Sequence, residues 1–341
     1  MRQAVMVSPG SIEFRDVPVP EPREDQVLVK IARIGVCGSD IHVYHGKHPY
    51  TSYPVVQGHE VSGEVVRKGR RARGVSVGDR VTIQPQVVCG TCYPCRHGQY
   101  HICDNLKVMG FQTTGTASEF FAVDAAKVLR LPAKMPFDFG AMVEPLAVGV
   151  HALSRGGPVR GRKVLVLGAG PIGNLAAQAA RGLGADVVAV TDLSDFRLDV
   201  AARCGIEHRL NPESADVGAF IARTFGPDKA DLILECVGAN PTVGQAVAHA
   251  RKGTDIIIVG VFGEKASVDM GLVQDRELRL IGTLMYQERD FRTAIRLIEE
   301  EKVTLAPLIT SHFAFSRYLD AYHHIEAHRD TSMKVMVDIQ E

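Results

Sequence analysis

The pattern of apolar and polar positions changes character near residue 160 of this chain. Before that point, short valine-rich runs such as 27–36 and 61–66 are partly alternating and are separated by prolines and glycines. Such runs predict the strands of a small, turn-rich β-barrel. Beyond it, continuous apolar runs over 163–167, 186–192, 230–238, 254–263 and 278–285 alternate with helix-like stretches. That alternation is typical of a doubly wound parallel sheet.

The tail carries two helix-like stretches and a last apolar run at 334–339. Because this final strand can join an earlier sheet, we expect the tail to pack back on the first domain. A length of 341 residues is also too great for one ordinary core. The sequence therefore predicts an α/β protein of two domains. Residues 1–150, completed by 286–341, form the first domain, and residues 151–285 form the second.

Composition narrows the possible partners. Lys plus Arg and Asp plus Glu number 39 each, which gives no electrostatic case for nucleic acid or an anionic membrane. We find no charged-then-apolar leader and no apolar run of about 18 residues, so we expect a soluble, cytoplasmic protein without a membrane partner. Seven cysteines, an odd number, favour metal binding over a disulfide framework.

Four of the cysteines, Cys89, Cys92, Cys95 and Cys103, follow the spacing C-x2-C-x2-C-x7-C. Four thiolates can close the shell of one tetrahedral ion, so the site they predict is a structural zinc. An iron–sulfur cluster and a loop of free or disulfide-bonded cysteines are the alternatives. The gap before the last cysteine and the polar surroundings favour zinc.

The stretch from Cys37 to Glu60 has the parts of an open metal site with a proton exit. It begins with a thiol and closes with the adjacent imidazole and carboxylate of His59 and Glu60. Catalytic zinc accepts these ligand types and keeps one position open. Ser39 and His42 lie between the ends of the stretch and are candidates to carry a proton; a satisfied loop histidine is the alternative role for His42.

Glu144 is a further candidate ligand. It stands just before Pro145 in a helix-like stretch, 138–153, that is rich in small and apolar residues. A carboxylate is costly to bury there unpaired. The alternative is an exposed acid in the first turn of the helix, where the helix dipole favours negative charge.

A glycine-rich turn follows the apolar run 163–167, with Gly168, Gly170 and Gly173 enclosing Pro171 and Ile172. Glycine lets the backbone turn tightly and approach a pyrophosphate at the N-terminus of the next helix. Asp192 ends the second strand, 24 residues after the first glycine, where an acid binds the adenosine ribose and repels a 2′-phosphate. The pattern predicts a dinucleotide site that prefers NAD to NADP.

Together these motifs resemble the zinc-dependent medium-chain alcohol dehydrogenase family. The resemblance rests on Gly58-His59-Glu60-x-x-Gly63-x5-Gly69, on the four-cysteine lobe and on the GAGPIG turn. The sequence Met142-Val143-Glu144-Pro145 is similar to the sorbitol (polyol), sugar-acid and threonine dehydrogenase branch. The implied fold is a GroES-like β-barrel catalytic domain plus a Rossmann domain.

The resemblance also implies roles for single residues. Cys37, His59 and Glu144 would bind the catalytic zinc, with Glu60 bound directly or through water. Asp40 would accept the free ring N–H of His59. Ser39 would pass the proton to His42. The residues expected around the cofactor, beyond the glycine-rich turn and Asp192, are Arg197, Val237, Val259, Val261 and Leu284.

The expected reaction transfers a hydride from a secondary alcohol of a polyol or sugar acid to NAD and yields a ketone. We expect two zinc ions per chain and a homodimer or homotetramer joined through the apolar edge segment 278–285. The loop 45–53 and the segment 283–287 depart from the sorbitol enzymes. A threonine 3-dehydrogenase or a butanediol-type dehydrogenase is therefore the alternative, and a non-catalytic nucleotide-binding protein is a remote one.

Overall fold

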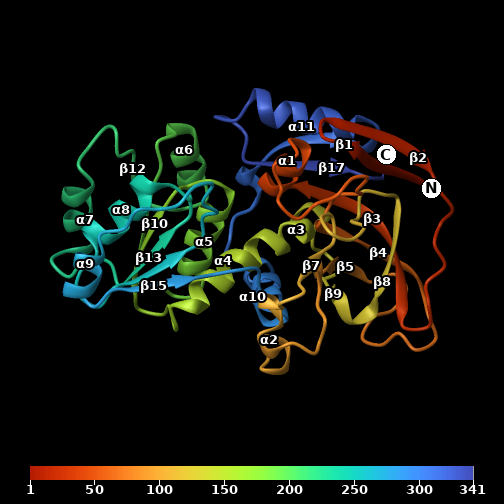
Figure 1. Ribbon diagram of the computed structural model, residues 1–341, viewed down its shortest axis with the longest axis horizontal. Coiled ribbons are helices and arrows are strands. Elements are labelled where there is room, and N and C mark those ends of the chain that lie inside the picture. The colour runs from red at the N-terminus through yellow and green to blue at the C-terminus, as the bar shows by residue number, and fades with distance from the viewer. Residues whose placement is uncertain (341) are drawn as a thin grey trace. The chain divides into compact units, whose positions relative to one another are not determined.

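The computed structural model describes residues 1–340 and divides into two compact units. The first comprises Met1–Glu144 and the segment from Ile309 onward, and the second comprises Pro145–Leu308. Figure 1 shows the chain coloured from its N-terminus to its C-terminus. Among the described residues, no helix has both the length and the apolar character that a membrane crossing requires.

The first unit is built on a seven-stranded, mainly antiparallel sheet. Its strands follow the order β16-β17-β3-β4-β5-β9, with β8 paired to β3. Their bounds are β3 Gln26–Val36, β4 Glu60–Lys68, β5 Arg80–Ile83, β8 Phe120–Asp124, β9 Val128–Arg130, β16 Ile309–Ala314 and β17 Lys334–Asp338. Two smaller ribbons pair β1 (Arg2–Ser8) with β2 (Ser11–Asp16) and β6 (Gln86–Val87) with β7 (Lys107–Val108).

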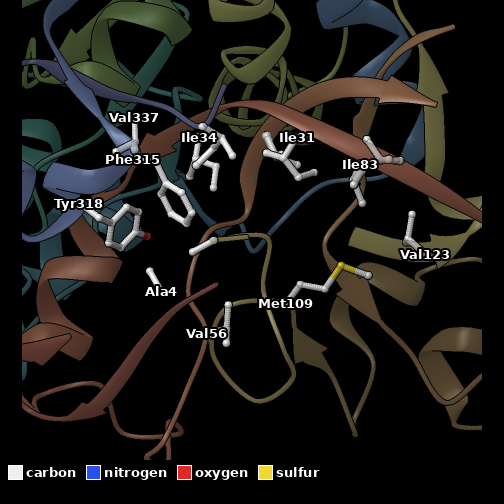
Figure 2. Packing of buried hydrophobic residues seen from close by; sticks show 14 of the residues in the cluster. Ala4, Ile31, Ile34, Val56, Ile83, Met109, Val123, Phe315, Tyr318 and Val337 are labelled. Atoms are coloured by element: carbon white, nitrogen blue, oxygen red, sulfur yellow. The ribbon is translucent and has the colours of Figure 1, made fainter. Parts of the chain in front are cut away.

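The core of the first unit joins residues that are far apart in the sequence. Figure 2 shows Ile31 and Ile34 of β3 facing the same interior as Ile83 of β5 and Val337 of β17. Most positions of β3 are buried, on both faces, which explains why its sequence is nearly continuous in apolar residues. The helices of this unit are α1 Gly38–Tyr44, α2 Tyr93–Arg96, α3 Phe137–Ala141 and α11 Tyr318–Ala327.

The second unit is a six-stranded parallel sheet in the order β12-β11-β10-β13-β14-β15. The strands are β10 Lys163–Leu167, β11 Val187–Thr191, β12 His208–Leu210, β13 Leu232–Glu235, β14 Asp255–Ile258 and β15 Arg279–Gly282. The helices are α4 Val143–Arg155, which begins at the end of the first unit, then α5 Pro171–Gly182, α6 Asp195–Arg203, α7 Val217–Phe225, α8 Asn240–His249, α9 Met270–Asp275 and α10 Glu288–Glu299. The strand order reverses beside β10, as in doubly wound sheets that bind nucleotides.

The unit boundaries differ from those expected from the sequence. Only the tail from Ile309 joins the first unit, where β16 and β17 extend its sheet, whereas 286–308 belongs to the second unit. Helix α10 buries Phe291, Ala294 and Leu297 there, and its Asp290 bonds to His151 of α4 at 2.7 Å. The periodicity of α10 predicted an amphipathic helix but not which of the two units its apolar face would cover.

Candidate metal and dinucleotide sites

The ligating atoms of Cys37, His59 and Glu60 all lie within 4.8 Å of one another. Sheet register produces this group, because β3 and β4 are antiparallel and pair Gly35 with Glu60. Cys37, just after β3, therefore lies beside the residues that open β4. Gly35 is needed at this point, since a Cβ there would stand 2.2 Å from a Glu60 carboxylate oxygen.

Asp40 is the buried centre of the hydrogen bonds around this group. Its carboxylate accepts from the Cys37 backbone N–H at 2.9 Å and from Gln57 Nε2 at 3.1 Å, and it lies 3.5 Å from His59 Nδ1. Gln57 in turn accepts from the hydroxyl of Tyr322 in α11 at 2.9 Å. The Asp40 carboxylate is thus held directly by Cys37 and Gln57, and indirectly, through Gln57, by Tyr322 near the C-terminus.

The imidazole of His59 is electrostatically coupled to its neighbours. Burial lowers its pKa, but the Asp40 carboxylate and the Cys37 thiol together raise that pKa well above the ordinary value. Its buried Nδ1 lies 3.5 Å from Asp40 and has no hydrogen-bond partner among residues 1–340. A ring ordered in this way beside a carboxylate is typical of a metal-binding histidine.

Lys334 is a member of this site that the sequence did not reveal. It opens β17, and its ammonium group donates to both carboxylate oxygens of Glu60 at 2.6 Å. Burial lowers the pKa of Lys334, but the negative charges of Glu60, Cys37 and Glu144 outweigh that effect and raise it. The only available signal was a single lysine at the start of an otherwise apolar strand.

Glu144 is buried, with an exposed fraction of 5%, so the alternative of an exposed first-turn acid is wrong. It occupies the first turn of α4 and acts electrostatically on Lys334. Within residues 1–340 it is not part of the group of three whose ligating atoms lie within 4.8 Å. Glu144 therefore belongs to the same buried electrostatic environment without being one of its three closest donors.

The proposed proton carriers differ in their surroundings. Ser39 donates its hydroxyl to Cys37 Sγ at 3.1 Å, while the His42 side chain is exposed. His48, in the loop after α1, is half-buried and stacks on Phe111 at 4.8 Å between ring centroids. Phe111 also contacts the His59 ring at 5.0 Å. Burial lowers the pKa of His48, and the nearby His42 lowers it further.

These residues fit a divalent cation on the chemistry of their donors. Sulfur, imidazole nitrogen and carboxylate oxygen are the ligand types that zinc takes. Glu60, Glu144 and Asp40 are buried carboxylates, and Lys334 is the buried cation in contact with this group. Buried charges need compensation, and a divalent ion would supply it.

The second cluster gathers Cys89, Cys92, Cys95 and Cys103, whose sulfur atoms also lie within 4.8 Å of one another. All four are free thiols, and the sulfur–sulfur distances of 3.7 Å from Cys92 to Cys103 and 3.5 Å from Cys103 to Cys89 are too long for a disulfide. Hydrogen bonds from the backbone N–H groups of Thr91 and Cys92 lower the pKa of Cys89 to about 5. The loop therefore presents a thiolate to an ion.

A third group of possible ligands, Asp138, His312 and Asp338, has a different explanation. The guanidinium of Arg33 lies 2.8 Å from Asp138 and 2.9 Å from Asp338. Since Arg33 pairs with both carboxylates and His312 lies beside them, this group is an ion-pair network that links α3, β3, β16 and β17.

The glycine-rich turn of the second unit has the geometry of a phosphate cradle. Gly168 has φ of +97°, and a Cβ on Gly173 would stand 1.8 Å from the Gly168 carbonyl oxygen. Only glycine permits this closure between β10 and α5. Pro171 begins α5, so the helix N-terminus follows the turn directly, as a dinucleotide site requires.

Asp192 follows β11, and its side chain contacts the backbone of the same glycine-rich turn. Its carboxylate accepts from the Ala169 N–H at 2.7 Å and from the Ser194 N–H at 2.9 Å. Arg197 reaches to within 3.8 Å of Asp192, and its buried Nε has no hydrogen-bond partner among the described residues. The turn thus combines an acid suited to a ribose with a cation suited to a phosphate.

The other residues expected around the cofactor follow successive strands at one edge of the sheet. Val237, Val261 and Leu284 come after β13, β14 and β15 and are 47%, 89% and 53% exposed. Val259 precedes Val261 and is half-buried. Carboxyl ends of parallel strands share an edge, so these apolar side chains form an uncovered row there.

Comparison with known families agrees with this geometry. Residues 23–133 match the family described as alcohol dehydrogenase GroES-like domain, and residues 171–300 match zinc-binding dehydrogenase. The chain belongs to the zinc-dependent medium-chain alcohol dehydrogenases and is an oxidoreductase of that NAD(P)-dependent class. This confirms the resemblance and the expected fold class.

Relatives with different substrates are similarly close. L-threonine 3-dehydrogenase of Pyrococcus abyssi is 34% identical over 91% of this chain and 90% of its own length. Sorbitol dehydrogenase of Halalkalibacterium halodurans is 34% identical over 93% of each chain. The 2-dehydro-3-deoxy-L-galactonate 5-dehydrogenase of Pseudoalteromonas atlantica is 35% identical over 85% of each.

Solved structures with bound nucleotide are also similar. A Sinorhizobium meliloti protein described as a zinc-binding dehydrogenase, bound to NADP, has a TM-score of 0.90 and 30% identity, with 99% of each chain covered. An Escherichia coli alcohol dehydrogenase complexed with NADH has a TM-score of 0.91 and 29% identity, again over 99% of each chain.

Proposed function

We propose that this chain oxidises a secondary alcohol of a polyol or sugar acid to a ketone, with zinc as the metal and NAD as the oxidant. The observation that carries the proposal is the buried group of Cys37, His59 and Glu60, whose donor types suit an open zinc site. Zinc would supply a Lewis acid that lowers the pKa of the substrate hydroxyl, and NAD would supply the redox chemistry.

Each residue of the site has a proposed task. Cys37, His59 and Glu144 hold the catalytic zinc, and Asp40 orients His59. Lys334 holds both carboxylate oxygens of Glu60 and so fixes the position from which Glu60 would act on the metal, directly or through water. Ser39 accepts the proton from the substrate hydroxyl, and His42, being exposed, releases it to water.

The four-cysteine cluster is the proposed structural zinc site. Four sulfur donors leave no position for a substrate, and its loop is held by the ion. The proposed content is therefore two zinc ions per chain. A protein that is colourless when fully loaded would agree with zinc and would exclude an iron–sulfur cluster.

For the cofactor we propose NAD rather than NADP. Asp192 is the supporting observation, because a carboxylate at this point binds the ribose hydroxyls and repels a 2′-phosphate. Arg197 beside it is the group that would favour a phosphate. Similar structures hold either nucleotide, so the kinetic comparison decides. If kcat/KM with NADP equals or exceeds that with NAD, this part of the proposal fails.

A hollow in the first unit is the candidate place for the substrate; none of the proposed zinc ligands lines it, and it adjoins the metal group through Phe111, whose ring contacts His59. Its volume is about 550 Å³, and it is lined by Tyr50 and Tyr53 of the loop 45–53, by Phe111, and by polar groups that include Gln112 and Arg15. Such a lining suits a hydroxyl-rich substrate, and Arg15 suits a carboxylate. Oxidation of threonine is the second candidate, favoured by the similarity to L-threonine 3-dehydrogenase.

We also propose a homo-oligomer. Strand β15 ends the sheet order, and three of its four residues are exposed. An open edge of this kind can pair with the same strand of a second copy.

The experiment is NAD reduction by the zinc-loaded protein across polyols, aldonates, threonine and 2,3-butanediol. Turnover of a polyol or an aldonate at the highest kcat/KM supports the proposal. Preference for threonine or butanediol would replace it with the second candidate or with a butanediol-type activity.

A further inference from the structure

Glu235 is a buried carboxylate that the proposed chemistry does not use. It ends β13, and its exposed fraction is 0%. Its side chain accepts hydrogen bonds from Val237 N at 3.0 Å, from Gly238 N at 2.9 Å and from Thr242 Oγ1 at 2.7 Å. Removing a carboxylate from water costs free energy. The burial of Glu235 among uncharged donors therefore calls for an explanation.

The contacts of Glu235 tie two turns together. Its side chain holds the turn 236–238, and its backbone carbonyl accepts from Val259 N at 2.8 Å and Gly260 N at 2.9 Å. A Cβ on Gly260 would stand 2.1 Å from Gly238 N and 2.7 Å from a Glu235 carboxylate oxygen. The two turns therefore touch backbone to backbone, with the carboxylate at their junction.

Sheet order indicates what these turns face. The glycine-rich turn follows β10, and Asp192 follows β11 on one side of it, whereas β13 and β14 lie on the other side. A dinucleotide spans the point where the strand order reverses. If Asp192 binds the adenosine ribose, the nicotinamide half lies over the ends of β13 and β14. The exposed side chains of Val237 and Val261 stand there.

We infer that Glu235 is a positioning residue for the nicotinamide half of the cofactor, acting by holding the turns 236–238 and 259–261. The inference rests on the proposed nicotinamide cofactor. A carboxylate suits the position because it only accepts hydrogen bonds, while a glutamine would turn its own donors toward backbone N–H groups. The adenosine half, held by Asp192, does not depend on Glu235.

The test is Glu235→Gln in the full, zinc-loaded chain, with calorimetric affinities for NADH and for ADP-ribose, which lacks nicotinamide. NADH affinity should fall about tenfold, which corresponds to about 1.4 kcal/mol, because an amide nitrogen would replace Oε2, which now accepts from Gly238 N at 3.2 Å, and would face that N–H with donors. ADP-ribose affinity should change by less than about twofold, since distant sites act independently. The KM for NAD should rise more than kcat falls.

Asp255→Asn is the matched control for general destabilisation. Asp255 is also a buried sheet carboxylate, but it begins β14 at the opposite edge and pairs with Arg162 and Arg279. This variant should lose stability and keep its NADH affinity. Equal weakening of NADH and ADP-ribose by Glu235→Gln, or no change in either, would overturn the inference.

Two other results need separate treatment: a Glu235→Gln variant that does not fold, and an unmodified protein that binds no nicotinamide nucleotide. If Glu235→Gln does not fold, Thr242→Val removes one donor to the same carboxylate. It should weaken NADH alone, and an unchanged NADH affinity would overturn the inference. If the unmodified protein binds neither NADH nor NADPH, the proposed function fails, and the inference fails with it for that separate reason.

Discussion

The four-cysteine cluster takes all of its sulfur atoms from residues 89–103, whereas the Cys37 cluster is assembled from distant parts of the first unit. Cys37 follows β3, His59 and Glu60 meet it through strand register, and Lys334 arrives from β17. The first cluster is partly exposed, and the second is largely buried. A closed site can thus be encoded in one loop, while an open site needs the whole unit to shield it and to balance its charges.

The largest effect is expected from Cys37→Ser. Activity should fall on the order of a thousandfold, because the Lewis acid contributes several kcal/mol to catalysis. The metal content should drop from two ions to one with the melting temperature little changed, as measured by elemental analysis and thermal unfolding. Cys204→Ser, at a buried thiol outside both clusters, should leave activity and metal content intact. An inactive Cys37→Ser protein with full metal content would remove Cys37 from the site.

Lys334→Met should reduce stability more than any other single change considered in the Cys37 cluster. It leaves the buried carboxylate of Glu60 without its cation, at a cost of about 3–5 kcal/mol in the free energy of unfolding. Denaturant unfolding measures this loss. The double variant Glu60→Gln/Lys334→Met should recover part of it, because no unpaired charge is left. Equal stabilities of the Lys334→Met and double variants would show that the unpaired charge of Glu60 is not the cause of the loss.

Cys95→Ser should have the converse effect to Cys37→Ser, with loss of stability and retention of activity. The structural ion should be lost and the melting temperature should fall by roughly 5–10 °C, since ion binding is linked to folding of that loop. At low temperature the kcat should stay close to that of the unmodified protein. A Cys95→Ser protein that is fully folded but inactive would contradict the division into a structural and a catalytic site.

Tyr322→Phe should have the smallest effect and tests how far the support of the Cys37 cluster extends. The hydroxyl of Tyr322 donates to Gln57, which holds Asp40, so its loss should cost about 1 kcal/mol and weaken zinc binding slightly. Competition with a chelator measures the zinc affinity. Tyr318→Phe is the control, because the Tyr318 hydroxyl contacts Tyr322 rather than Gln57. Identical zinc affinities in the two variants would limit the network to Gln57.

Much of the architecture could be predicted from periodicity and punctuation. The apolar runs that follow residue 160 correspond to β10, β11, β13, β14 and β15, and the glycine-rich turn lies between β10 and α5. The strand β16 was not predicted, because its sequence ITSHFA is short. In the structure most of its residues are half-buried. The structure groups 286–308 with the second unit, unlike the domain bounds expected from the sequence, because amphipathic periodicity does not say which surface a helix will cover.

Within the metal cluster, the sequence indicated donors but not their surroundings. The stacking of His48 on Phe111 could not be predicted, because the two rings come from separate loops of the first unit. Lys334 stands 274 residues from Glu60, and no local pattern joins them. Long-range ion pairs of this kind depend on strand order, which a single sequence does not show.

What the sequence determined by itself is whatever depends on near neighbours in the chain. The four cysteines of 89–103 lie close together in the sequence, and so do the glycines of the Gly168–Gly173 turn. The geometry of each motif therefore depends mainly on the local backbone. Tertiary structure alone decided the burial of Glu144, the pairing of Lys334 with Glu60, and the junction of two turns at Glu235. The physical reason is that burial and ion pairing depend on which strands become neighbours, and that follows from packing of the whole unit rather than from any short stretch.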